Sequence, residues 1–270
     1  MDTKELTLWI ACSLAFRGRE TLFSKLLQNL GSVSAVLQSP QARQVPKDKA
    51  QQILNYCLKS GIAIIPQSDP RFPKALRTAD KPIVLYASGD TDILEKTKTA
   101  GVIGARHAAE YSLRICSQFT SQLVRKGVVI VSGFAMGIDR CAHQACINAG
   151  GKTVAVLGCG IGFDYPKGSL PFQQQIAQNG IVISEYPPLS KPERGNFPHR
   201  NRLIASLSEK LLVVQASDKS GCLSTVSHAL SQGKDVFVVP PRDIFSPQFQ
   251  GQVSLIRDGA QTAFEPGDLF

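Results

Sequence analysis

From residue 97 onward, the chain alternates short apolar runs with helical patterns, and this alternation constrains the fold more than any other feature. The runs expected to form strands are Ala100–Gly104, Val128–Ser132, Thr153–Gly158, Ile181–Ser184, Lys210–Gln215 and Asp235–Val239. Helical patterns lie between most of them, notably Ala108–Lys126 and Ile138–Ala149. Continuous β-branched strands joined by helices form a parallel sheet that helices cover on both faces. The sequence therefore predicts an α/β domain with a largely parallel sheet.

The segment before residue 67 has a different pattern and predicts a small all-helical domain over residues 1–66. The helical stretches are Leu6–Leu14, Thr21–Leu30, Ser32–Leu37 and Asp48–Ser60. Gly31 and Gly61 follow two of them as plausible C-caps. The domain is expected to end in a short strand, Ile62–Pro66. Residues 67–96 begin with a stretch rich in proline and charge, which predicts a connection into the α/β domain of residues 97–270.

Composition and cysteine usage exclude several classes of protein. The chain is 43% hydrophobic and 19% charged, as expected of a folded globular protein, and its net charge of +9 weakly favours a polyanionic partner. The seven cysteines include no C-x-x-C pair. Cys141, His143 and Cys146 share one helical stretch without a second cluster, so no metal site is expected. Reduced thiols, with no signal peptide and no long apolar segment, predict a cytoplasmic protein without membrane contact.

Ligands of parallel sheets bind at the carboxyl ends of the strands, so the polar residues there are the candidate site. The first strand leads into Gly104-Ala105-Arg106 and the second into Ser132-Gly133, each followed by a helix. Glycine turns at helix N-termini offer free backbone N–H groups to a phosphate, and arginine adds a planar donor fork. A surface salt bridge is an equally good interpretation of Arg106. Asp139 is expected to order the second turn, because a carboxylate repels phosphate.

Later strand ends carry further basic and polar residues. A phenylalanine just ahead of two arginines and an asparagine suits a nucleic-acid backbone with an adjacent base, although one arginine could instead pair with Glu185. The dinucleotide and Walker A glycine patterns are absent, so no cofactor is expected. No convincing catalytic constellation is present either. The full set of candidate DNA-binding residues is Arg106, Ser132, Gly133, Lys167, Phe197, Arg200, Asn201, Arg202, Lys219, Ser220 and Gly221.

Together these motifs resemble the DNA-processing protein A (DprA/Smf) family. The matching elements are Gly104-Ala105-Arg106 with Tyr111-Ser112, Ser132–Asp139, Ser184–Pro187, Phe197–Arg202, Lys219–Thr225 and Gly251–Ala260. The resemblance spans about residues 62–264. It implies an extended Rossmann-like domain that binds single-stranded DNA as a homodimer. It also implies a non-enzymatic role in natural transformation and recombination, in which the protein protects incoming DNA and helps a RecA-type recombinase to load.

The sequence departs from the family pattern in places, and a rival interpretation stays open. The N-terminal helices resemble the family's sterile-alpha-motif-like domain, but Phe16-Arg17-Gly18-Arg19 replaces its glycine hairpin. The chain ends at Phe270, so no C-terminal winged helix is expected. The alternative is a nucleotide-binding or N-glycosidic-bond-hydrolysing enzyme of the lysine-decarboxylase-like Rossmann group. In that group a glutamate would stand where this chain has His228.

Overall fold

The computed structural model describes residues 1–46, 48–78 and 80–270. Within them, one nine-stranded sheet has the order β1-β2-β6-β5-β4-β3-β7-β8-β9. In this order, every pairing from β6 to β9 is parallel. At the other end of the sheet, β2 pairs antiparallel with both of its neighbours, β1 and β6. The strands are β1 Ala63–Pro66, β2 Val84–Gly89, β3 Thr99–Gly104, β4 Val129–Ser132, β5 Thr153–Val156, β6 Ile181–Ser184, β7 Lys210–Gln215, β8 Asp235–Val238 and β9 Gln261–Thr262. The predicted α/β class with a largely parallel sheet is confirmed.

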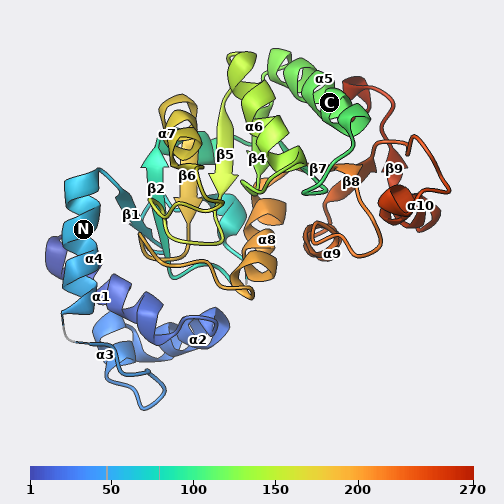
Figure 1. Cartoon of the computed structure of the whole chain (residues 1–270). Helices are drawn as coiled ribbons and strands as arrows, with labels where there is room; N and C mark the ends of the chain where they lie inside the picture. The colour runs from blue at the N-terminus through green and yellow to red at the C-terminus, as the bar shows by residue number, and fades with distance from the viewer. Residues whose placement is uncertain (47, 79) are drawn as a thin grey trace.

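Helices cover both faces of this sheet (Figure 1). On one face lie α5 Glu110–Arg125, α6 Ile138–Asn148 and α7 Leu170–Asn179, and on the other lie α8 Asn196–Leu207, α9 Leu223–Ser231 and α10 Gln250–Arg257. Strand side chains alternate between the two layers. In β4, Val129 and Val131 join the core beneath α8, while Ile130 joins the core beneath α5 and α6. This two-sided burial explains why the strands are continuous apolar runs.

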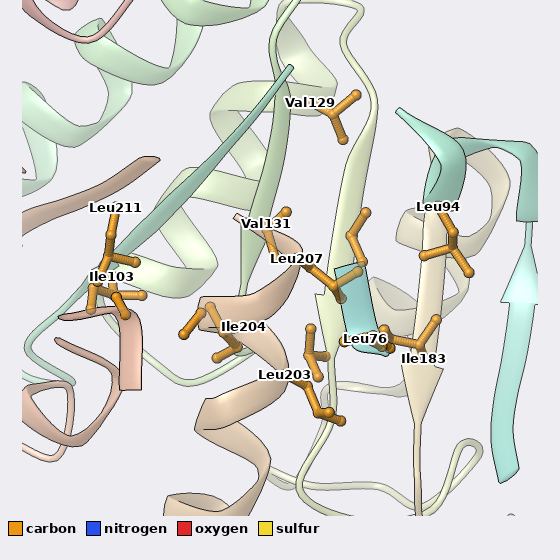
Figure 2. Close-up of a cluster of buried hydrophobic side chains, with 14 of the residues drawn as sticks. Leu76, Leu94, Ile103, Val129, Val131, Ile183, Leu203, Ile204, Leu207 and Leu211 are labelled. Atoms are coloured by element: carbon orange, nitrogen blue, oxygen red, sulfur yellow. The ribbon is translucent and has the colours of Figure 1, made fainter. Parts of the chain in front are cut away.

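Helix α8 packs across the centre of the sheet. Figure 2 shows Leu203, Ile204 and Leu207 of this helix among the side chains of the strands they cover. All residues from 200 to 207 are buried. A helix buried on every side holds its polar side chains at fixed positions, and the residues at its N-terminal end lie near the carboxyl ends of the strands.

Four further helices lie beside the β1 end of the sheet (Figure 1). They are α1 Thr3–Ala15, α2 Glu20–Leu30, α3 Val33–Leu37 and α4 Lys49–Ser60, and each lies where the sequence predicts a helix. Gly31 and Gly61 end two of them in the left-handed conformation, with φ of 74° and 64°. Their apolar side chains form one cluster with β1, β2 and α7. Their independence as a sterile-alpha-motif-like domain stays a prediction.

Residues 67–96 contain regular structure that the sequence pattern did not reveal. Strand β2 lies inside the sheet, between β1 and β6, and 3-10 helices cover Lys74–Leu76 and Thr91–Glu95. The first four residues of β2 are buried. The flanking prolines and charges therefore belong to turns around a strand that lies inside the sheet, next to its edge strand β1, and the sheet extends further toward the N-terminus than expected. Among the described residues, no helix is long and apolar enough to cross a membrane.

Candidate functional site

A cleft of about 710 Å³ opens at the carboxyl ends of the central parallel strands. A second cavity of about 250 Å³ adjoins it, and both are lined by Arg106, Phe197 and Arg200. Among the other predicted site residues, Asn201, Lys219, Ser220 and Gly221 line the cleft, and Gly133 and Lys167 line the smaller cavity. The fold thus brings nine of the eleven candidate residues together. The two left out are Ser132 and Arg202.

Glycines allow the turns after β3 and β4 to lie against each other. Gly137 has φ of 77°, and a Cβ there would lie 2.2 Å from the carbonyl oxygen of Ala105. The backbone N–H of Ile138 donates to that same oxygen at 3.2 Å. A side chain at position 137 would therefore separate the two turns as well as strain the backbone. The N-terminus of α6 is fixed beside the turn that carries Arg106.

Arg200 is the buried centre of the site, with 4% of its surface exposed. Its guanidinium donates to the carbonyl oxygens of Gly133 and Val156, and its Nε donates to Asn201 Oδ1 at 3.1 Å. Arg200 therefore ties the carboxyl ends of β4 and β5 to α8. A Cβ on Gly133 would lie 2.9 Å from Arg200 Nη2, so only glycine leaves room for this contact.

Asp139 lies next to Arg200 and is also buried. Burial raises the pKa of the Asp139 carboxyl, and the neighbouring Arg200 charge opposes that rise. One carboxylate oxygen accepts a hydrogen bond from the backbone N–H of Ala135 at 3.3 Å. The side chain therefore binds the turn after β4, which is the ordering contact expected from the sequence.

The exposed cations of the site are Arg106, Lys167, Arg194 and Lys219. None of them forms an ion pair with any residue that the structure describes. Arg106 consequently lacks the surface salt bridge that the sequence left open. Arg194 was missed by sequence reasoning, because it lies in a loop outside the matching motifs. These side chains make the rim of the cleft electropositive and leave their donors available to an anion.

Two aromatic rings lie beside these cations. Arg106 is 5.7 Å from the centroid of the Phe197 ring, and the Tyr165 ring centroid is 5.5 Å from that of Phe197. A Cβ on Gly158 would lie 2.7 Å from Phe197, so the ring packs directly on that backbone. Tyr165 is absent from the set of site residues predicted from the sequence. It lies in the loop after β5, two residues before the predicted site residue Lys167, and this position in the sequence could have indicated a role in the site.

Two predicted site residues lie elsewhere. Ser132 is fully buried and donates from its Oγ to the carbonyl oxygen of Val102 at 2.6 Å. Arg202 is 2% exposed and pairs with Glu185 at 2.7 Å and with Asp80 at 3.1 Å. Side chains two residues apart on a helix point about 200° apart, so Arg202 turns away from the cleft that Arg200 reaches. The sequence alternative, in which one arginine pairs with Glu185, is correct for Arg202.

Glu185 is held in its ionised form by this pair. Burial raises the pKa of the Glu185 carboxyl, but the charge and hydrogen bonds of Arg202, together with His199, bring it down to about 2. His199 Nε2 lies 3.5 Å from Glu185 and 3.8 Å from Glu20, which belongs to α2. These three side chains are close enough to share a cation. Arg202 already donates to both Glu185 oxygens, so the cluster is a polar contact that links α2 to α8 and the loop after β6.

The cysteines and histidine considered as metal ligands have other partners. His143 is buried, and its Nδ1 is 2.7 Å from Thr153 Oγ1. Burial lowers the pKa of His143 to about 3, so the ring is neutral at physiological pH. Cys146 contacts the carbonyl oxygen of Lys152, and Cys141 contacts that of Leu113. Each side chain therefore packs against a different part of the backbone.

The sequence of this chain is similar to those of known proteins. A family model described as DNA recombination-mediator protein A matches residues 62–270. The DNA processing protein DprA of Bacillus subtilis is 40% identical over 223 residues, which cover 82% of this chain and 75% of the relative. Protein Smf of Synechocystis is 40% identical over 208 residues, covering 74% of this chain and 51% of that protein.

Two solved structures resemble this fold, one of them over nearly the whole chain. The X-ray structure of DprA from Streptococcus pneumoniae aligns with a TM-score of 0.82 at 29% identity, covering 99% of this chain and 97% of the other. A DNA processing protein A from Helicobacter pylori, whose structure concerns its single-stranded DNA binding mode, aligns with a TM-score of 0.69 at 33% identity. That alignment covers 77% of this chain and 93% of the other.

Proposed function

The chain belongs to the DNA recombination-mediator protein A (DprA/Smf) family, and from this premise we propose that it binds single-stranded DNA along the carboxyl edge of its sheet. One observation carries the proposal: exposed cations that form no ion pair with a described residue follow several strands at one edge, and an aromatic pair lies among them. Arg106, Lys167 and Lys219 would bind phosphates. Phe197 and Tyr165 would stack on bases.

The same geometry favours single strands over duplex DNA. Stacking on Phe197 requires a base that is free of its partner strand, and duplex bases are already stacked and paired. Because aromatic stacking accepts every base and phosphates carry no sequence information, little sequence preference follows. The H. pylori relative is described as a single-stranded DNA binder, which supports the assignment.

We further propose that the protein acts by binding and not by catalysis. The rival activity, N-glycosidic hydrolysis, needs a carboxylate to stabilise an oxocarbenium-like centre. The position expected for that carboxylate holds His228 on α9, a half-buried residue whose pKa burial lowers. Asp139, the buried carboxylate of the site, is engaged by the β4 turn and Arg200.

The family suggests a cellular role. We propose that the protein protects incoming single strands in the cytoplasm and helps a RecA-type recombinase to load during natural transformation. We also propose a homodimer, in which two linked clefts would add avidity on a long strand. The exposed Ile244 and Phe245 of the loop after β8 are candidates for the dimer contact. Light scattering at micromolar concentration tests this assembly.

The binding proposal is tested by Arg106→Ala and Lys219→Ala. Each variant should weaken binding to oligothymidylate and reduce the slope of log K against log salt by roughly 0.7, the share of one phosphate contact on a single strand. Melting temperature should barely change, because both side chains are exposed and neither forms an ion pair within the described part of the chain. Titrations of the unmodified chain with duplex DNA and with mononucleotides measure its preference for single strands. Equal affinity for duplex and single strands, or unchanged binding by both variants, would contradict the proposal.

A further inference from the structure

Exposed cations follow three of four neighbouring strands along the carboxyl edge of the sheet. Read across β5, β4, β3, β7 and β8, the segments that follow the strands contribute Lys167 after β5, Arg106 after β3 and Lys219 after β7. The next strand in the row is β8, and the loop that follows it carries Arg242. In the opposite direction, β6 is followed by Glu185, whose side chain is 6% exposed and paired with Arg202, and further along the same loop by the exposed Arg194. Arg242 therefore extends the row of exposed cations past β7 to the end of β8.

Arg242 is presented in a form suited to a phosphate. It is exposed, and it forms no ion pair with any described residue. Its guanidinium lies 5.7 Å from the ring centroid of Tyr111, in the first turn of α5. An arginine that lies on an aromatic ring loses less conformational freedom on binding and keeps the N–H groups at its edge for an anion.

The loop that carries Arg242 is fixed to the rest of the edge. Gln252 is buried, and its Nε2 donates to the carbonyl oxygens of Val214 at 3.0 Å and Val239 at 2.7 Å. This one amide joins the carboxyl ends of β7 and β8. Gln248 belongs to the same loop and lines the 710 Å³ cleft. Arg242 is therefore held on a segment that forms part of the cleft wall.

We propose that Arg242, supported by Tyr111, is a phosphate contact beyond the cleft, and that the DNA strand leaves the site across the end of β8. The inference rests on the proposed function and adds to it the direction of the strand. Adjacent strands lie about 4.8 Å apart, so the row from β5 to β8 spans about 19 Å. That length corresponds to roughly three to six nucleotides, from fully extended to stacked at about 3.4 Å per step. DNA shorter than this can be bound without reaching Arg242.

Binding of oligothymidylates of two lengths to the full chain tests this step. The variants are Arg242→Gln and a matched control, Arg257→Gln, which removes an exposed arginine in the last turn of α10. On a 20-nucleotide strand, Arg242→Gln should reduce the salt slope by roughly 0.7 and weaken binding about fivefold at 0.1 M salt. On a trinucleotide the loss should be smaller, because the other cations of the row can hold it. Arg257→Gln should change neither.

Substitutions of Tyr111, the residue whose ring supports Arg242, give a second measurement. Tyr111→Phe keeps the ring and should bind as the unmodified chain does, whereas Tyr111→Leu should lose part of the Arg242 contribution. If the long strand binds but Arg242→Gln matches Arg257→Gln, this inference is overturned while the proposed function stands. If the unmodified chain binds neither length, both are overturned. Equal melting temperatures of all variants would show that the losses arise from binding.

Discussion

Replacing Arg202 by methionine separates a DNA contact from a structural ion pair. The sequence predicts that Arg202 lines the DNA site, but the structure places it against Glu185, with 3% of its side chain exposed. Removing the arginine leaves the Glu185 carboxylate buried without its main partner. Breaking a buried pair in this way costs about 3–5 kcal/mol, a large part of the roughly 5–15 kcal/mol that stabilises a typical domain.

The pKa of Glu185 gives an independent magnitude. Its folded value of about 2 lies below the ordinary 4.5, and this difference corresponds to about 3 kcal/mol. Because the folded pKa is lowered, this stability is fully present above pH 4.5 and is lost as the pH falls toward 2. In Arg202→Met, burial acts with less opposition and raises the pKa of Glu185. The variant should therefore become more stable, relative to the unmodified chain, as the pH falls below neutral.

Denaturant unfolding from pH 7 down to pH 3, combined with DNA binding across salt concentrations, checks this reasoning. Arg202→Met should lose about 3–5 kcal/mol at pH 7. Adding Glu185→Gln should restore part of that loss, because the unpaired charge is gone. The matched control is Arg194→Met, an exposed residue of the cleft, which should leave the free energy of unfolding unchanged. An Arg202→Met variant of nearly normal stability with a shallower salt slope would refute the assignment.

Three further outcomes are expected. Phe197→Leu should lose about 1–3 kcal/mol of binding free energy per stacked base at an unchanged salt slope, measured by fluorescence titration. Gly133→Ala places a Cβ 2.7 Å from Asp139 and 2.9 Å from Arg200, so it should destabilise the chain by about 1–3 kcal/mol in denaturant unfolding, whereas Gly195→Ala, which meets nothing within 4 Å, should not. Because burial lowers the pKa of His143 to about 3, stability should fall as the pH drops below about 6.5, and His143→Gln should reduce that loss in the same titration.

The parallel strands were predictable because burial on both faces leaves a plain signature in the sequence. Ile181–Ser184 and Lys210–Gln215 form strands with the expected bounds, and the other four predicted parallel strands differ from expectation by one or two residues at an end. The two-residue β9, which pairs in parallel with β8, was not predicted. The missed strand β2 is as apolar as these. It was hidden because prolines and charges precede it, and these residues dominate a local interpretation. Antiparallel pairing with β1 and β6 is a long-range property that local sequence does not carry.

The candidate site was predictable as a set of residue types, but the direction of each side chain was not. Strand ends with glycine and a cation identify the edge, because parallel strands all end there. The motif Arg200-Asn201-Arg202 does not reveal which arginine faces the cleft, since that depends on how α8 rotates against the sheet. The sequence likewise gave no sign that Ser132 Oγ would turn inward to the carbonyl of Val102. Partners distant in the chain decide both cases.

Arg200 and Asp139 explain how a carboxylate is tolerated at an edge that would bind phosphates. Both are buried, and their opposite charges lie close enough for each to shift the pKa of the other. Together they form a nearly neutral wall, so we expect the attraction for the proposed DNA strand to arise mainly from the exposed Arg106, Lys167 and Lys219. Salt therefore screens the cations of the rim but leaves the buried pair intact. It follows that high salt should release DNA without loosening the turns that shape the cleft.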